Sequence, residues 1–139
     1  MAALVKADPE MQIMARRLQT APGVGPIVAA TLIAEMPELG HLDRRRIAAL
    51  AGLAPIARDS GKRAGPRSIG GGRPVVRTIL YLAALQASRR SAVFREFRDR
   101  LRLAGKPTKA ALIATARKLL VTLNAMVANS ADYDPATAT

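Results

Sequence analysis

The residue types best suited to chemistry lie in a basic, glycine-rich segment. Ser60 is followed by Gly61, and six basic residues flank this pair along the chain: Arg58, Lys62, Arg63, Arg67, Arg73 and Arg77. Arginine neutralises the non-bridging oxygens of a phosphodiester, and glycine lets a backbone approach a phosphate closely. The pattern therefore indicates phosphodiester chemistry with Ser60 as a candidate nucleophile, although a Ser-Gly pair in a loop is more often an ordinary turn.

A second candidate is the turn sequence Pro22-Gly23-Val24-Gly25-Pro26, which separates two apolar segments. The glycines permit unusual dihedrals and close approach, and the helix that follows offers free N–H groups that hold a phosphate without reading a base. We expect Gly23, Val24 and Gly25 to contact a DNA backbone in a helix–hairpin–helix element over residues 18–36. An ordinary helix–helix turn is the alternative.

Other reactive residue types give weaker signals. Tyr81 lies one helical turn after Arg77 and is an alternative nucleophile, but a Tyr in an Ala-rich helix more often packs at the edge of the core. His41 is the only histidine, and there is no cysteine. The ten acidic residues are scattered, so the chain by itself is expected to bind no metal and to need no cofactor.

Composition favours an anionic partner. The 139 residues contain 22 Lys and Arg against 10 Asp and Glu, a net charge of +12. Residues 44–118 alone contain nineteen Lys and Arg against three acidic residues, which is typical of nucleic-acid binding. Arg44, Arg45 and Arg46 begin a predicted helix, a placement that a bound phosphate would make tolerable. A ribosomal-type surface or a solvated arginine face is the alternative.

The apolar pattern predicts an all-α domain. Half of the residues are apolar, which is too many for a disordered basic tail. No apolar run approaches a membrane span, and no signal peptide is recognisable, so we expect a soluble cytoplasmic protein. About six helices are predicted, capped by Asp8, Asp43, Ser91 and Thr108 among others. They cover residues 8–20, 26–36, 44–52, 74–89, 91–104 and 108–128.

The remaining segments are expected to be irregular. Residues 54–72 contain five of the ten glycines and read as a long basic loop, a length that is usually functional or disordered. Residues 129–139 are expected to form a frayed tail. The first helix begins close to Met1, which suggests that the chain is the back end of a longer protein.

Several short motifs occur in an order that resembles one known family. They are Pro22-Gly23-Val24-Gly25-Pro26, Ala30-Thr31-Leu32-Ile33-Ala34-Glu35, Ala51-Gly52-Leu53-Ala54-Pro55, Asp59-Ser60-Gly61-Lys62, Leu80-Tyr81-Leu82-Ala83-Ala84, Gly105-Lys106-Pro107 and Ala116-Arg117-Lys118-Leu119-Leu120. From about Leu18 to Tyr133 the chain resembles the C-terminal domain of transposases of the insertion-sequence 110/116/902 family.

The resemblance implies a specific organisation and mechanism. Residues 1–20 would end a linker or coiled-coil helix, and residues 21–128 would form the C-terminal domain, with Ser60 forming a covalent phosphoserine link to DNA. An N-terminal Ruv-C-like domain would supply acidic ligands for magnesium, a structured RNA would guide the reaction, and the full-length protein would form a homo-oligomer. The sequence does not include that acidic domain, so we expect the chain to be a truncated element or an excised domain.

One local departure from the family concerns the end of the loop. The family usually has an Ile-Ser-Lys-x-Gly-Asn stretch there, whereas Ile69 is followed by Gly70-Gly71-Gly72-Arg73, without the Lys and the Asn.

Three functions remain open at this point. The first is DNA recombination through Ser60, with Lys62, Arg63, Arg67 and Arg73 holding phosphates and Gly23 and Gly25 contacting a backbone. The second is a non-catalytic nucleic-acid-binding module, and the third is a structural RNA-binding protein of ribosomal type.

Overall fold

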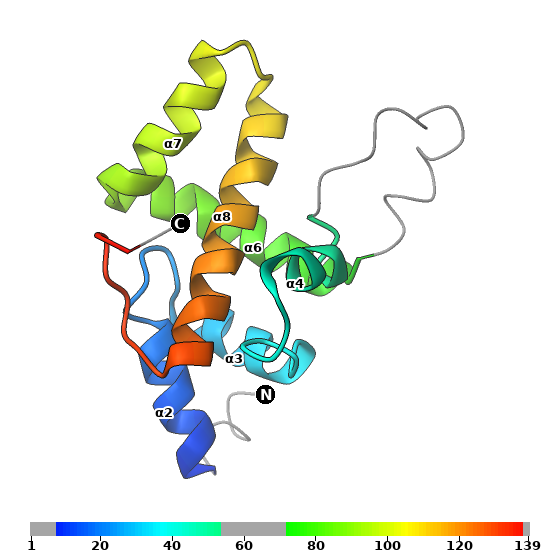
Figure 1. Cartoon of the computed structure of the whole chain (residues 1–139), viewed down its shortest axis with the longest axis vertical. Coiled ribbons are helices and arrows are strands. Elements are labelled where there is room, and N and C mark those ends of the chain that lie inside the picture. The colour runs from blue at the N-terminus through cyan, green and yellow to red at the C-terminus, as the bar shows by residue number, and fades with distance from the viewer. Residues whose placement is uncertain (1–7, 54–71, 138–139) are drawn as a thin grey trace.

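The computed structural model describes residues 8–53 and 72–137, which form six helices and no strands (Figure 1). They are α2 (Pro9–Leu18), α3 (Pro26–Glu35), α4 (Arg44–Leu50), α6 (Pro74–Arg90), α7 (Ala92–Leu103) and α8 (Thr108–Asn129). The predicted all-α class is confirmed, and each predicted helix is present with ends that differ by at most two residues. The basic loop predicted over 54–72 lies outside the described residues except for Gly72.

Helix starts follow local hydrogen-bonding chemistry. The Asp8 carboxylate accepts the N–H groups of Glu10 and Met11, and the Asp43 carboxylate accepts that of Arg46. The Ser91 hydroxyl caps α7 by accepting the Phe94 N–H. Each cap satisfies donors that have no partner inside the helix. The predicted Thr108 cap is wrong, because Pro107 occupies the cap position of α8 and Thr108 is already its first helical residue.

Helix α8 is the central element of the fold. It packs against α2, α4, α6 and α7, and in Figure 1 it runs through the middle of the molecule. Leu119, Leu120 and Leu123 are fully buried on it. An 18-residue window of this helix has a mean hydropathy of 1.4, so α8 is long and apolar enough to cross a membrane by length and composition. Arg117 and Lys118 interrupt that window, so the apolar run on either side of them is shorter than a membrane span, and 56% of the window is buried within this fold.

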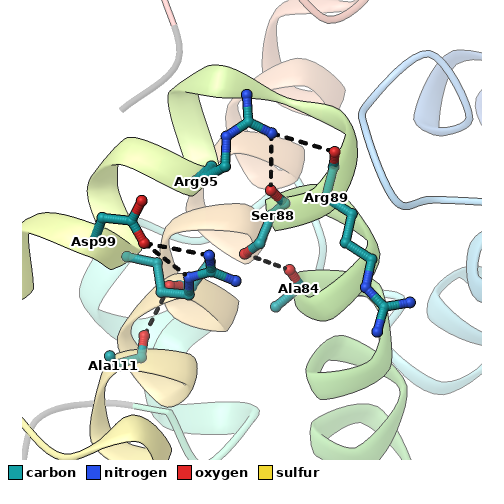
Figure 2. A network of polar contacts seen from close by, with 8 residues as sticks. Ala84, Ser88, Arg89, Arg95, Asp99 and Ala111 are labelled. Carbon is teal, nitrogen blue, oxygen red and sulfur yellow. Dashed lines mark hydrogen bonds and ion pairs between the residues drawn. The ribbon is translucent and has the colours of Figure 1, made fainter. Parts of the chain in front are cut away.

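Small residues let α6 lie close to its neighbours. Ala83, Ala84 and Ala87 are buried, and the fully buried Phe94 of α7 fills the space beside them. Figure 2 shows how the α6–α7 corner is closed: the Arg95 guanidinium donates to the carbonyl oxygens of Ser88 and Arg89 at the end of α6. A cation at this position satisfies carbonyls that the helix leaves without an internal partner.

Two apolar residues at helix ends are exposed. Ala104 lies at the exposed end of α7, and Ile27 is 72% exposed in the first turn of α3.

The described part of the C-terminal tail is held against α2. The Tyr133 N–H donates to the Thr20 hydroxyl over 2.8 Å, and Asp132 pairs with Arg17 at 3.4 Å. The Tyr133 ring packs against the core beside Phe94, with ring centres 6.4 Å apart. Residues 130–137, which the sequence predicts to fray, therefore lie across the α2 end of the domain.

Candidate nucleic-acid interface

The turn between α2 and α3 is packed against α6. Gly23 has a φ of +82°, a conformation that side-chain-bearing residues rarely adopt. A Cβ atom at Gly23 would collide with the backbone of Ala83 and Ala87, so the absence of a side chain is what lets the turn reach α6. Val24 is buried with 5% exposure. Gly23 and Val24, both predicted to contact DNA, therefore have packing roles in the fold.

Gly25 differs from its neighbours in the same turn. It precedes α3 with an extended backbone that any residue adopts (φ −98°), so the predicted need for glycine dihedrals applies to Gly23 and not to Gly25. Apart from its two chain neighbours, no atom of the described residues lies within 4 Å of the position a Gly25 Cβ would take. The first-turn N–H groups of Ile27 and Val28 have no intrahelical acceptor, as at any helix start. This corner is open to a close-fitting anion.

The two chain ends that flank residues 54–71 meet at one place, which we call the neck (Gly52, Leu53, Gly72, Arg73). The Arg73 N–H donates to the Leu50 carbonyl over 3.1 Å, and the Leu53 N–H donates to that of Ala48 over 2.9 Å. Gly52 and Gly72 approach so closely that a Cβ on either would collide with the other or with the Arg77 guanidinium.

Only some of the predicted site residues lie within the described ranges. Arg77 lies against both neck glycines and is half-buried. The predicted nucleophile and four of its basic neighbours lie outside the described residues: Ser60, Arg58, Lys62, Arg63 and Arg67. Tyr81, the alternative nucleophile, is partly buried against the core, as the packing alternative predicted.

Arg73 forms the shortest ion pair of the described residues. Its two terminal nitrogens each contact one Glu38 carboxylate oxygen at 2.8 Å, and one of them also donates to the Glu35 carbonyl at 2.9 Å. This hydrogen bonding lowers the pKa of Glu38 from its ordinary 4.5 to about 2 and raises the pKa of Arg73. A phosphate at Arg73 would have to compete with a bidentate carboxylate.

The site prediction did not name one further group of cations. Burial lowers the pKa of Lys118, and the positive charges of Arg100 and Arg44 lower it further. Lys118 of α8 and Arg100 of α7 lie against the same Phe97 ring, and Arg44 begins α4, which packs on α8. Arg100 is exposed on α7, and the sequence around it gives no sign that α4 and α8 add charges beside it.

The described residues provide no metal centre. Within 8–53 and 72–137, no group of three or more His, Cys, Asp or Glu side chains is arranged to hold an ion.

Comparison with known sequences gives the family. The profile described as "Transposase IS116/IS110/IS902 family" matches residues 15–99, more than half of the 139 residues. The chain is a member of this transposase family. The match covers part of α2, the α2–α3 turn, the neck and α6, and it ends within α7.

Three relatives of this family member are longer proteins. The chain is 39% identical over 126 residues to "Insertion element IS900 uncharacterized 42 kDa protein" of Mycobacterium paratuberculosis (85% of this chain, 30% of that protein). It is 33% identical over 125 residues to "Insertion element IS116 uncharacterized 44.8 kDa protein" of Streptomyces clavuligerus (86% and 30%). It is 30% identical over 135 residues to the "Pilin gene-inverting protein" of Moraxella lacunata (94% and 42%). The transposase-family chain thus spans between 30% and 42% of the length of these relatives.

Proposed function

We propose that this chain is the part of a DNA transposase that contacts the DNA backbone and acts on its phosphodiesters through Ser60. The observation that carries this proposal is the neck. It joins the two ends of the segment that contains Ser60 and fixes them to α4 and α6 through the Arg73–Leu50 backbone bond and the Arg73–Glu38 ion pair. A nucleophile needs a fixed structural support of this kind, because a small displacement of the nucleophile loses most of the rate gained from its positioning.

The proposed step transfers a DNA strand to the protein. The Ser60 Oγ attacks a backbone phosphorus, an O–P bond forms, and the bond from phosphorus to the deoxyribose oxygen breaks. The departing oxygen takes up a proton. Serine is a weak nucleophile that needs a proton acceptor, and Asp59, set among many cations, is a poor one. We therefore assign the acceptor to a part of the longer protein outside this chain.

Magnesium would be held by that other part of the longer protein. The family resemblance implies a metal with acidic ligands from an N-terminal domain, and the described residues here do not form a set of ligands for it. The step proposed for Ser60 is written without the metal. A structured guide RNA, a homo-oligomer of the full-length protein and a cytoplasmic location are further parts of the proposal.

DNA contact is assigned to two places. Arg58, Lys62, Arg63 and Arg67 are proposed to hold phosphates near Ser60, and the open corner at Gly25 is proposed to approach a backbone phosphate. Gly23 and Val24 support that corner by fixing the turn on α6, and Arg73 and Arg77 support the neck.

Covalent trapping tests the proposal. The chain is joined to the acidic domain that the resemblance implies and incubated with guide RNA and DNA, and covalent protein–DNA species are separated under denaturing conditions. We expect a covalent band for the wild type and none for Ser60→Ala. Tyr81→Phe is the matched control and should keep the band. Equal bands in wild type and Ser60→Ala would contradict the proposal, and loss only in Tyr81→Phe would assign the nucleophile to Tyr81.

A second candidate function is a nucleic-acid-binding module without catalysis. It is favoured by Arg44 of α4, Arg100 of α7 and Lys118 of α8, which form no ion pair within the described residues. The same trapping experiment separates the two, because a binding module holds DNA in native gels but gives no covalent band.

A further inference from the structure

The basic residues of the described ranges fall into two groups. Four arginines are paired with carboxylates: Arg17 with Asp132, Arg46 with Asp43, Arg73 with Glu38 and Arg98 with Asp99. Arg95 and Arg102 donate to backbone carbonyl oxygens instead. The charges that remain without such partners in 8–53 and 72–137 include Arg44, Arg100 and Lys118. These three residues, from α4, α7 and α8, are called the three-helix basic face.

Lys118 is held in place within this face. Its Nζ lies 5.0 Å from the centre of the Phe97 ring and 5.9 Å from that of Phe94. The guanidinium carbon of Arg100 lies 5.8 Å from the Phe97 ring centre. The two cations therefore share one aromatic ring, and cation–π attraction fixes them without neutralising their charge.

The surroundings of Lys118 disfavour its positive charge. Burial and the charges of Arg100 and Arg44 lower the pKa of Lys118, which is the direction expected when no anion compensates a cation. Helix packing keeps the three backbone positions in place, because α8 contacts both α4 and α7. A bound anion would remove this repulsion, and a polyanion would meet all three charges at once.

We propose that the three-helix basic face binds the phosphate backbone of duplex DNA, separately from the Gly25 corner and the neck. The inference rests on the proposed function in one respect, because it takes DNA as the partner. The face reads no base sequence, since cations that meet phosphates fix position and orientation only.

The aromatic residues favour a duplex over a single strand. Single-stranded nucleic acids are held by bases stacked on exposed aromatic rings. The chain has four aromatic residues, and each is buried or packed in part: Tyr81, Phe94, Phe97 and Tyr133. Phe97 lies beneath Lys118 and Arg100, so the face offers cations without a free stacking surface.

Two double variants with the same charge change provide the test. Arg44→Gln/Arg100→Gln removes two unpaired cations, whereas Arg46→Gln/Arg98→Gln removes two paired cations from the same helices, each two residues away. Affinity of the 139-residue chain for a random-sequence DNA duplex is measured over a range of salt concentrations. Circular dichroism confirms that both variants fold.

We expect the first double variant to lower the steepness of the log affinity–log salt plot by about 2, close to one unit for each lost phosphate contact. Its affinity at about 0.1 M salt should fall at least about tenfold, and the control variant should stay within about threefold of wild type. Lys118→Met, which keeps the packing on Phe97, should lower the slope by about 1.

Four outcomes would overturn the inference. Equal losses in the two double variants would mean that only net charge matters. Stronger binding to an RNA duplex of equal length, with a larger loss in Arg44→Gln/Arg100→Gln, would assign the face to RNA. If the wild type binds DNA steeply with salt and the first variant is unchanged, this inference alone fails. If the wild type does not bind DNA, the proposed function fails with it.

Discussion

The neck and the three-helix basic face both involve cations, but they use them in opposite ways. At the neck, Arg73 is engaged by Glu38 and a helix carbonyl, and Arg77 lies against two glycines. On the basic face, Lys118 and Arg100 share an aromatic ring and have no carboxylate partner within the described residues. Proximity to a motif along the chain therefore does not reveal whether a charge is available to a ligand; its three-dimensional partners decide that.

The largest effect is expected at Gly23, where the α2–α3 turn packs against α6. Gly23→Ala forces a side chain into a φ of +82° and against the backbone of α6, so we expect a loss of at least about 3 kcal/mol in the free energy of unfolding. Gly25→Ala is the matched control in the same turn and should lose less than about 1 kcal/mol, because its Cβ meets nothing. Urea unfolding measures the stability of both variants. Similar losses would contradict the conclusion that Gly23 has a packing role that Gly25 lacks.

Asn124 tests whether the basic face depends on a fixed α4. Its side chain accepts the Gly40 N–H at 2.7 Å and donates to the Leu42 carbonyl at 2.9 Å, which ties the segment before α4 to α8. Asn124→Ala leaves two polar backbone groups without partners and should lower the free energy of unfolding by about 2 kcal/mol. The exposed Asn129→Ala is the control and should change it little. A stability loss without any change in DNA affinity would show that Arg44 needs no fixed position.

The Arg73–Glu38 ion pair at the neck should make the stability of the folded chain depend on pH. The pKa of Glu38 lies at about 2 in the folded chain and near 4.5 when unpaired, so its contribution to stability is complete above about pH 4.5. It is lost as the pH falls towards about 2. We expect the urea midpoint of wild type to decline over this window more than that of Glu38→Gln. Parallel declines would mean that the Arg73–Glu38 contact does not stabilise the neck.

The smallest effect is expected at Gly25. Gly25→Val should leave the chain folded and weaken DNA binding by a few-fold, because the added side chain covers the corner that an anion would approach. Circular dichroism and native gels measure the two quantities. Unchanged affinity in the folded variant would make the α2–α3 turn a connector only.

The helices were predictable from the sequence because each begins at a local signal. Asp8, Asp43 and Ser91 act as caps, and Pro26 and Pro74 begin helices at the first position. These interactions span a few residues and are visible in the sequence. The exception is Thr108, where Pro107 takes the cap position and shifts the helix start by one residue.

The site was less predictable because its contacts are distant along the chain. Glu38 meets Arg73 across 35 positions, and Gly23 meets α6 some sixty positions away. A count of nearby charges cannot reveal such pairs. The basic face could not be predicted for the same reason, because Arg44, Arg100 and Lys118 come near one another only when α4, α7 and α8 pack.

The salt dependence of duplex-DNA binding by the wild-type chain tests the central claim most directly. Three phosphate contacts from the basic face alone predict a log–log slope of about −2.7, so affinity should fall roughly forty-fold between about 50 mM and about 200 mM salt. Contacts from the basic segment around Ser60 would steepen it. A decrease of less than about fourfold, equivalent to one contact or fewer, would contradict the claim that unpaired cations of this chain bind the DNA backbone.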